Sequence, residues 1–153
     1  MRLSFAPRAL TKAALFTALA AGLAACGSGI SLDEPIEGPV WWLTQLADQP
    51  VSAGREPQRD PQVAFERSSG RVSGSGGCNR MSGTFVRSGS SLRISQLGST
   101  RMACADPSRA ETEGLFFQAL QSTATYRLAG SGRLALIDAG GRTVALLSAQ
   151  PSR

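Results

Sequence analysis

The sequence contains no histidine, and this absence excludes several kinds of active site at once. Serine–histidine and cysteine–histidine nucleophiles need an imidazole base, and two thiols without histidine make a poor zinc site. Carboxylates do not replace the imidazole, because Glu111 and Glu113 stand two apart on a predicted helix and therefore face different directions. We expect no catalytic residues, no metal site and no cofactor, and predict that the chain is not an enzyme.

Lysine is nearly absent as well, and most of the net positive charge of the chain comes from its first 25 residues. Lys12 is the only lysine, and the whole chain has a formal net charge of +5. The first 25 residues hold three of the sixteen basic residues and none of the eleven acidic ones, so their removal leaves +2. The remaining arginines are scattered along the chain. This pattern is typical of an ordinary globular domain, and we expect no nucleic acid as a partner.

No apolar run is long enough to span a membrane, but the N-terminus is typical of an export signal. Arg2, Arg8 and Lys12 precede the apolar residues 13–23, which fall short of the roughly 20 that a spanning helix needs. The run ends in Leu23-Ala24-Ala25-Cys26, which resembles the bacterial lipobox. There, the cysteine sulfur is joined to diacylglycerol and becomes the new N-terminus. Ordinary cleavage after residues 18–20 is the alternative, although it truncates the apolar core.

The lipobox interpretation predicts where the protein lies in the cell. Residues 1–25 form the signal peptide, and Cys26 carries the lipid that anchors the mature chain to a membrane. Gly27 follows Cys26 in place of the aspartate that retains lipoproteins in the inner membrane of enteric bacteria. We therefore expect a protein of the bacterial cell envelope, anchored in the outer membrane and facing the periplasm.

Cysteine is scarce, and the odd number of cysteines is informative. The chain has three, so a lipid on Cys26 leaves Cys78 and Cys104 as a pair. An exported domain permits a disulfide between them. Closing a loop of 26 residues stabilises a fold by about 3–4 kcal/mol on the loop-entropy model.

The mature chain is long enough for one domain with its own core. Residues 26–38 are rich in glycine, proline and acids and are predicted to form a flexible tether. The domain is expected to cover residues 39–148, followed by a tail of residues 149–153. Turn residues recur every eight to twelve positions, as in antiparallel β-structure. Short strands are predicted at residues 40–46, 62–66, 71–73, 83–86, 91–95, 124–128, 133–137 and 143–147.

One segment has helical periodicity instead. In residues 111–121 the apolar side chains share one face of a helix. Asp106 before Pro107 suits an N-cap followed by proline at the first helical position, while Ser108 with Glu111 offers an alternative capping box. The sequence therefore predicts a mainly β fold, a small antiparallel barrel-like sheet with one α-helix over an open end or face.

The glycine-rich segment 72–83 is the most distinctive motif. A phosphate-binding loop needs Lys-Ser/Thr after its last glycine and then a helix, whereas Cys78-Asn79-Arg80 and a predicted strand follow here. We therefore interpret the segment as a bent strand and turn. Asn79 is the only asparagine in the chain, and we expect it to have a specific backbone role.

Two other pairs of residues allow a binding interpretation. A disulfide would bring Arg80 and Arg101 into one neighbourhood, where two guanidinium groups would suit an anion or a partner protein. The alternative is that both are solvated surface residues. Trp41 and Trp42 face opposite ways on a strand, so one is expected in the core and the other at a rim, where carbohydrate stacking competes with simple packing.

Together these motifs resemble the META domain, the domain of the bacterial heat-shock lipoprotein HslJ. The resemblance covers roughly residues 40–147 and implies a barrel-like β fold with one helix. HslJ-like proteins are linked to heat shock and novobiocin resistance without an established biochemical activity, so the resemblance supplies no catalytic residues. It rests on Trp41-x-Leu43, Gly74-x-Gly76-Gly77-Cys78-Asn79-Arg80-x-x-Gly83, Ser99-Thr100-Arg101-Met102-Ala103-Cys104, a helix ending in Leu120, and Leu134-x-Leu136.

These observations predict a non-enzymatic, membrane-anchored envelope lipoprotein that serves as an interaction module or supports the envelope under stress. Its expected partners are the membrane, through the lipid, and another envelope protein. A small-ligand carrier or inhibitor built on the barrel is the alternative. An internal cavity lined by Trp41 or Trp42, Phe65 and Phe85 would favour the carrier, and a filled core with an exposed apolar patch would favour the interaction module.

Overall fold

The computed structural model describes residues 35–52, 54, 59–130 and 132–149. Cys26, the predicted signal peptide and most of the predicted tether and tail lie outside these residues. Within them, the elements are β1 (Val40–Leu46), β2 (Gln49–Pro50), β3 (Gln62–Glu66), β4 (Arg71–Ser75), β5 (Arg80–Ser88), β6 (Ser91–Ser99), α1 (Pro107–Ser122), β7 (Thr123–Ala129), β8 (Arg133–Asp138) and β9 (Thr143–Ser148).

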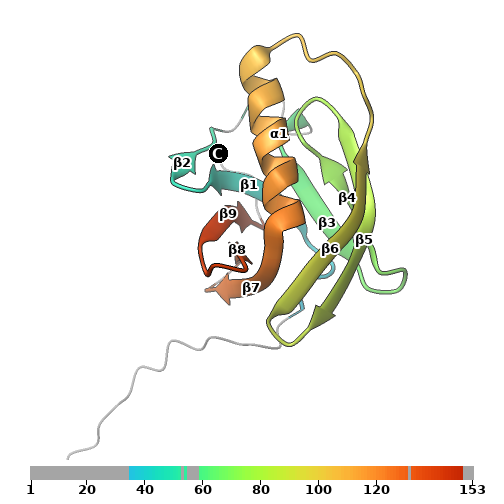
Figure 1. The fold of residues 1–153 in the computed structure, drawn as a ribbon, viewed down its shortest axis with the longest axis vertical. Coiled ribbons are helices and arrows are strands. Elements are labelled where there is room, and N and C mark those ends of the chain that lie inside the picture. The colour runs from blue at the N-terminus through green and yellow to red at the C-terminus, as the bar shows by residue number, and fades with distance from the viewer. Residues whose placement is uncertain (1–34, 53, 55–58, 131, 150–153) are drawn as a thin grey trace, which may run out of the picture.

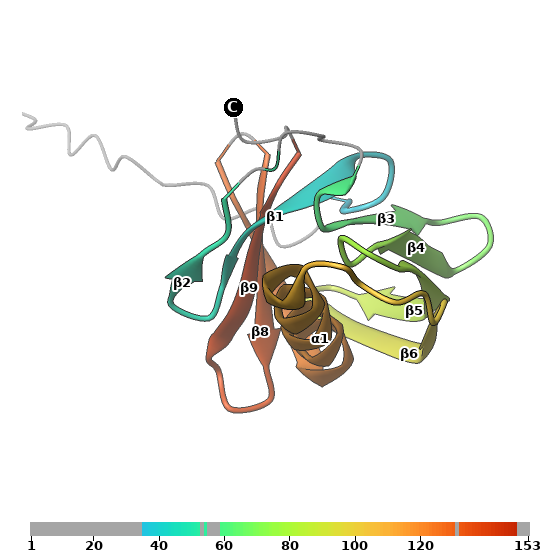
Figure 2. The same cartoon turned by 90° about the horizontal axis from the view of Figure 1, so that it is seen from above.

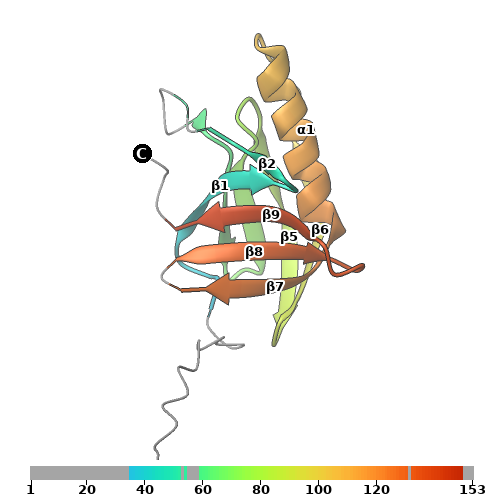
Figure 3. The same ribbon diagram turned by 90° about the vertical axis from the view of Figure 1, so that its left-hand side faces the viewer.

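The strands form a closed antiparallel barrel. Strands β1 and β3 to β9 follow one another around the sheet, and β9 returns to pair with β1 at Leu43 and Leu147. The two-residue β2 extends a hairpin from β1. Figure 3 shows β1, β9, β8 and β7 stacked in this order, with α1 along one side. Closure pairs the outer strands of the sheet with each other, and the predicted mainly β barrel with one helix is confirmed.

Alternation along the strands builds the core. In β3, Val63 and Phe65 point inward and are buried, and in β5 the inward residues include Phe85. The rings of Phe65 and Phe85 meet edge to face, with centroids 5.1 Å apart. Trp41 is the core member of the tryptophan pair, 2% exposed, while Trp42 is half-buried. Of the aromatic side chains named for a carrier cavity, Trp41, Phe65 and Phe85 therefore belong to the packed core.

The helix α1 fills an opening in the barrel wall. Strands β6 and β7 pair only between Ser91 and Thr125 and separate beyond that point. Helix α1 connects the two strands and packs against β1, β6, β8 and β9. Its buried residues are Phe116, Ala119 and Leu120. Figures 1 and 2 show α1 between β6 on one side and β8 and β9 on the other.

The start of α1 is set by Asp106 and Pro107. The Asp106 carboxylate accepts hydrogen bonds from the backbone N–H and the hydroxyl of Ser108, at 2.9 and 2.8 Å. These bonds, with the charge of Arg109, hold the pKa of Asp106 below its ordinary value. Of the two predicted caps, the structure contains Asp106 with Pro107 at the first position, so the helix begins at the first of the two predicted starts.

The barrel has two chemically different ends. We call the end that carries α1 and the turns β1–β2, β4–β5 and β8–β9 the helical end. The opposite end carries the turns β3–β4, β5–β6 and β7–β8, and we call it the terminal end because the described chain enters and leaves there. Near the entry, the N–H of Gly38 donates to Phe65, and near the exit the N–H of Ala149 donates to Gly132.

The predicted tether ends too late in the sequence. Residues 35–38 were assigned to it, but Ile36 is fully buried and its carbonyl oxygen accepts a 2.7 Å hydrogen bond from Trp41 Nε1. Glu37 accepts a 3.1 Å bond from Arg87 Nε, and Arg87 also donates to the Tyr126 hydroxyl. The tether prediction missed this because Ile36 is a single apolar residue without periodic neighbours. The domain therefore includes Ile36 and Glu37.

Glu37 forms an ion pair with Arg87 at the terminal end of the barrel. Burial alone would raise the pKa of its carboxyl group. A hydrogen bond from its own backbone N–H, the bond from Arg87 and the charges of Arg87 and Arg67 outweigh burial and lower the pKa below its ordinary value. A lowered folded-state pKa stabilises the fold above the ordinary pKa, and this stabilisation is lost as the pH falls through the folded value.

Glu37→Gln should therefore lower the free energy of unfolding at pH 7 by about 1–3 kcal/mol, because it leaves Arg87 buried without its counter-ion. The variant should also lose stability less steeply than the native protein below about pH 4.5, since the titrating group is gone. Urea unfolding at about pH 3 to 7 measures both effects. Equal acid sensitivity of the two proteins would show that Glu37 does not carry this pH dependence.

Candidate functional site

The glycine-rich segment forms the end of β4 and the tight turn into β5. Gly77 has a φ of +113°, and the N–H of Gly76 donates to the Asn79 carbonyl oxygen at 2.9 Å. A Cβ on Gly74 would overlap the carbonyl oxygen of Gln62, so glycine is required where β4 passes β3. A strand follows the turn, so the segment lacks the loop-to-helix geometry of a phosphate-binding loop.

The side chain of Asn79 makes every hydrogen bond available to it. Its Oδ1 accepts from Thr100 Oγ1 at 2.9 Å and from the Met102 N–H at 2.7 Å. Its Nδ2 donates to the Met102 carbonyl at 3.3 Å and to Glu113 Oε1 at 2.6 Å. Asn79 is 7% exposed, so these four bonds replace water almost completely. The expected backbone role of Asn79 is a bridge to a distant segment of backbone.

Glu113 completes the arrangement from the first half of α1. Its Oε2 accepts the backbone N–H groups of Cys78 and Asn79, at 3.0 and 2.6 Å. A Cβ on Gly76 would overlap Glu113 Cγ, so glycine makes room for the carboxylate. No local pattern in the sequence indicated this contact, because 34 residues separate Asn79 from Glu113.

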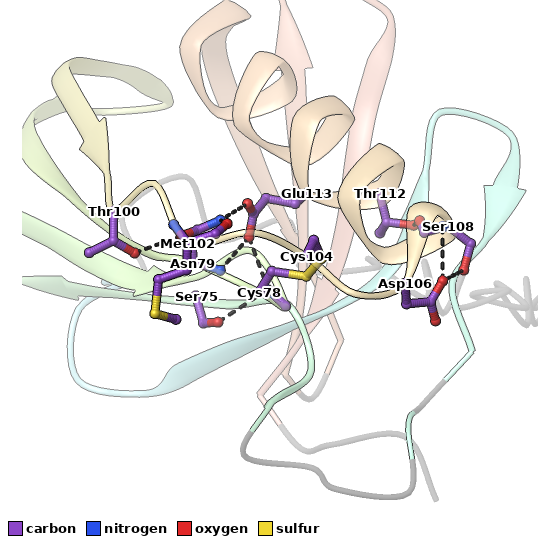
Figure 4. The surroundings of a disulfide bond; sticks show 11 residues. Ser75, Cys78, Asn79, Thr100, Met102, Cys104, Asp106, Ser108, Thr112 and Glu113 are labelled. Atoms are coloured by element: carbon purple, nitrogen blue, oxygen red, sulfur yellow. Dashed lines mark hydrogen bonds between the residues drawn. A yellow bond between two sulfur atoms is a disulfide. The ribbon is translucent and has the colours of Figure 1, made fainter.

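A disulfide joins Cys78 to Cys104, with the two Cα atoms 5.7 Å apart. It is the pairing that the cysteine count suggested. We call the group formed by the disulfide and the residues that hydrogen-bond beside it the junction, and Figure 4 shows it between the β4–β5 turn and α1. The members of the junction are Cys78, Asn79, Thr100, Met102, Cys104 and Glu113.

The junction is built to hold three segments together. Asn79 and Glu113 use their hydrogen bonds within the chain itself, so their polar atoms do not point to an open site. Among the described residues, no group of three or more His, Cys, Asp or Glu side chains lies close enough to hold a metal ion. We interpret the junction as structural.

Arg80 and Arg101 lie beside the junction. Thr100, next to Arg101, donates its N–H to the Arg80 carbonyl, so the backbones are close, while both side chains are exposed. Arg80 lines a wide surface hollow of about 1140 Å³ together with Arg59 and Arg109, but Arg101 does not. The proximity of the two backbones is as expected. Binding of an anion by this arginine pair stays a prediction.

A second hollow is the candidate binding surface. This groove, of about 810 Å³, runs between α1 and the β1–β2 hairpin. Leu115 is 48% exposed although it is a large apolar residue, and Asp60 and Arg109 are among the charged lining residues. The apolar residues that line the groove include Leu46, Val51, Leu115, Ala119 and Val144. Trp41, Phe65 and Phe85 line neither hollow.

The architecture defines a class of protein: a small closed barrel with a helix in its wall, braced by a disulfide. The chain belongs to the META domain family, whose sequence model matches residues 34–151. The match begins before Pro35, in agreement with the packing of Ile36 and Glu37 against the barrel.

Solved structures support the same fold. A protein structure determined by NMR is 26% identical, with a TM-score of 0.58 over 74% of this chain and 90% of the other. A second NMR structure, of a protein from Burkholderia xenovorans, is 25% identical with a TM-score of 0.56, over 74% and 82% of the two chains. A DUF4847 family protein from Bacteroides vulgatus shares the fold at 14% identity, with a TM-score of 0.55 over 77% and 96%. No curated protein matches this chain.

The contact between Asn79 and Glu113 can be tested by a double-mutant cycle. Asn79→Asp places a carboxylate against that of Glu113, and Glu113→Gln turns an amide donor toward the donor Nδ2 of Asn79. Each single change should lower the free energy of unfolding by about 2–4 kcal/mol.

In the double variant, the amide introduced at position 113 donates to the carboxylate introduced at position 79. The double variant should therefore be about 1–3 kcal/mol more stable than additivity predicts. Urea unfolding of the four proteins measures this coupling, and additive effects would contradict the assignment.

Proposed function

We propose that the protein is a non-enzymatic lipoprotein of the bacterial envelope, whose META domain binds a segment of another envelope protein. The observation that carries the proposal is the apolar-lined groove beside α1 at the helical end, opposite the point where the chain enters the barrel. A lipid on Cys26 would hold the terminal end toward the membrane and present the groove to the periplasm.

The packing of the core favours an interaction module over a ligand carrier. Phe65 and Phe85 contact each other inside the barrel, and Trp41 is hydrogen-bonded to Ile36. The side chains that would have to line a carrier cavity are therefore used for packing. The exposed apolar surface lies in the groove outside the barrel, where Leu115 meets solvent.

The groove has the chemistry of a peptide-binding surface. Its apolar residues come from α1, β1, the segment after β2, and β9, while Asp60, Arg109 and Glu111 place both signs of charge in its lining. An apolar centre with a polar rim is the usual anatomy of protein interfaces. The occupant that fits is a polypeptide segment with apolar side chains at its centre and charges of both signs at its flanks.

Membrane attachment must come from the lipid if the proposal is right. Among the residues that the structure describes, no helix is both long and apolar enough to cross a membrane. Two or three acyl chains on one cysteine make attachment persistent, at roughly 0.8 kcal/mol for each buried CH₂ group.

Cys26→Ser should abolish metabolic labelling with palmitate and release the protein from the membrane fraction, because the thiol is the group that receives diacylglycerol. Cys104→Ser is the matched control, since it removes a cysteine without touching the lipobox and should keep the label. Lipid that persists on the Cys26→Ser variant would refute the anchor.

Leu115 should be the residue through which the partner is held. A photo-crosslinking amino acid at position 115 should give a discrete adduct in intact cells, and the same group at Val86 should not. Val86 is the matched control because it is 71% exposed on β5 and lines neither hollow. The segment identified from the adduct should bind the purified protein, and Leu115→Asp should weaken binding at least about tenfold. If Val86→Asp weakens binding equally, the groove is not the binding surface.

A further inference from the structure

Charge is distributed unevenly between the two ends of the barrel. At the helical end, the described residues include five arginines (Arg59, Arg80, Arg101, Arg109 and Arg142) and six acidic residues (Asp48, Asp60, Asp106, Glu111, Glu113 and Asp138). The terminal end has six arginines (Arg67, Arg71, Arg87, Arg93, Arg127 and Arg133) against two acidic residues, Glu37 and Glu66. The terminal end is therefore the basic one.

The excess charge at the terminal end is exposed to solvent. Arg87 is only 12% exposed and is neutralised by Glu37. Arg67 is 67% exposed even though it lies 3.6 Å from the same carboxylate. Arg93, Arg127 and Arg133 are exposed on β6, β7 and β8. Strands β6, β7 and β8 are neighbours in the sheet, so these three arginines share one side of the barrel near this end, while Arg67 lies on the β3–β4 turn.

We propose that the basic terminal end docks on the anionic phospholipid headgroups of the membrane that carries the anchor. This inference rests on the proposed lipid at Cys26, which sets the distance. The nine residues from Cys26 to Pro35 span at most about 32 Å when fully extended. The terminal end therefore stays within about this distance of the anchored cysteine. The exposed arginines lie at the same end of the barrel.

The magnitude of the attraction is sufficient to orient the domain. One basic side chain at an anionic membrane surface raises the binding constant for the membrane about fivefold, so two such side chains raise it about 30-fold. Asp33 and Glu34 in the tether oppose this attraction, but six arginines against four acidic residues still leave the terminal end positive. Docking by this end would point the groove beside α1 away from the membrane and leave it open to a partner.

The test uses the full lipidated protein in vesicles that contain a headgroup spin label as a quencher. A fluorophore is attached at Ser88→Cys, on the terminal end, or at Gln49→Cys, on the helical end, since both residues are exposed. On vesicles of phosphatidylcholine with phosphatidylglycerol, quenching at position 88 should exceed quenching at position 49. The difference should shrink on phosphatidylcholine alone and in about 0.5 M salt, where screening becomes severe.

Two matched double variants separate the arginines of the two ends. Arg127→Gln/Arg133→Gln should lower the ratio of docked to undocked orientations about 30-fold, and Arg80→Gln/Arg101→Gln should leave it unchanged. Equal quenching at both positions on membrane-bound protein overturns the inference while the anchor stands, as does a difference that is just as large on phosphatidylcholine alone. Protein that fails to attach to either vesicle overturns the anchor and the inference together.

Discussion

The hydrogen bonds of Asn79 are the constraint on which the helical end depends. One buried amide links the β4–β5 turn to the segment between β6 and α1 and to α1 itself. A buried amide that lost one of these partners would cost free energy, whereas the full set stabilises a single arrangement. The disulfide between Cys78 and Cys104 repeats the same connection covalently, so the two restraints support each other.

The position of α1 follows from this constraint. Strands β6 and β7 separate after one pair, which leaves an opening that the helix fills. Burial of Phe116 and Leu120 fixes the later part of α1 over the core, while the bonds from Glu113 to the β4–β5 turn fix its first half. The groove lies between this helix and the β1–β2 hairpin, so its width depends on contacts made on the other side of α1.

The sequence predicted the parts of the fold that depend on local chemistry. Alternating apolar residues revealed the strands, and Asp106 before Pro107 marked the true start of the helix. The interpretation of the glycine-rich segment as a bent strand and turn holds at Gly77, whose φ is +113°, whereas Gly74 and Gly76 are needed for a different reason, the close approach of Gln62 and Glu113. The META resemblance predicted the barrel, and the family match bears it out.

The features that the sequence did not reveal depend on long-range contacts. Glu113 looked like one of two unrelated helical carboxylates, because its partners lie 34 and 35 residues away. Ile36 looked like part of a tether, because only the folded barrel supplies the indole that binds its carbonyl oxygen. The position of the chain ends depends on topology and not on particular side chains. Successive barrel strands run in opposite directions, so an even number of them returns the chain to the end of the barrel where it entered. The two ends of the described chain therefore lie at the terminal end of the barrel, and the groove lies at the helical end. A lipid on the residues before β1 would attach the terminal end to the membrane, so the membrane and a partner bound in the groove would be separated by the length of the barrel.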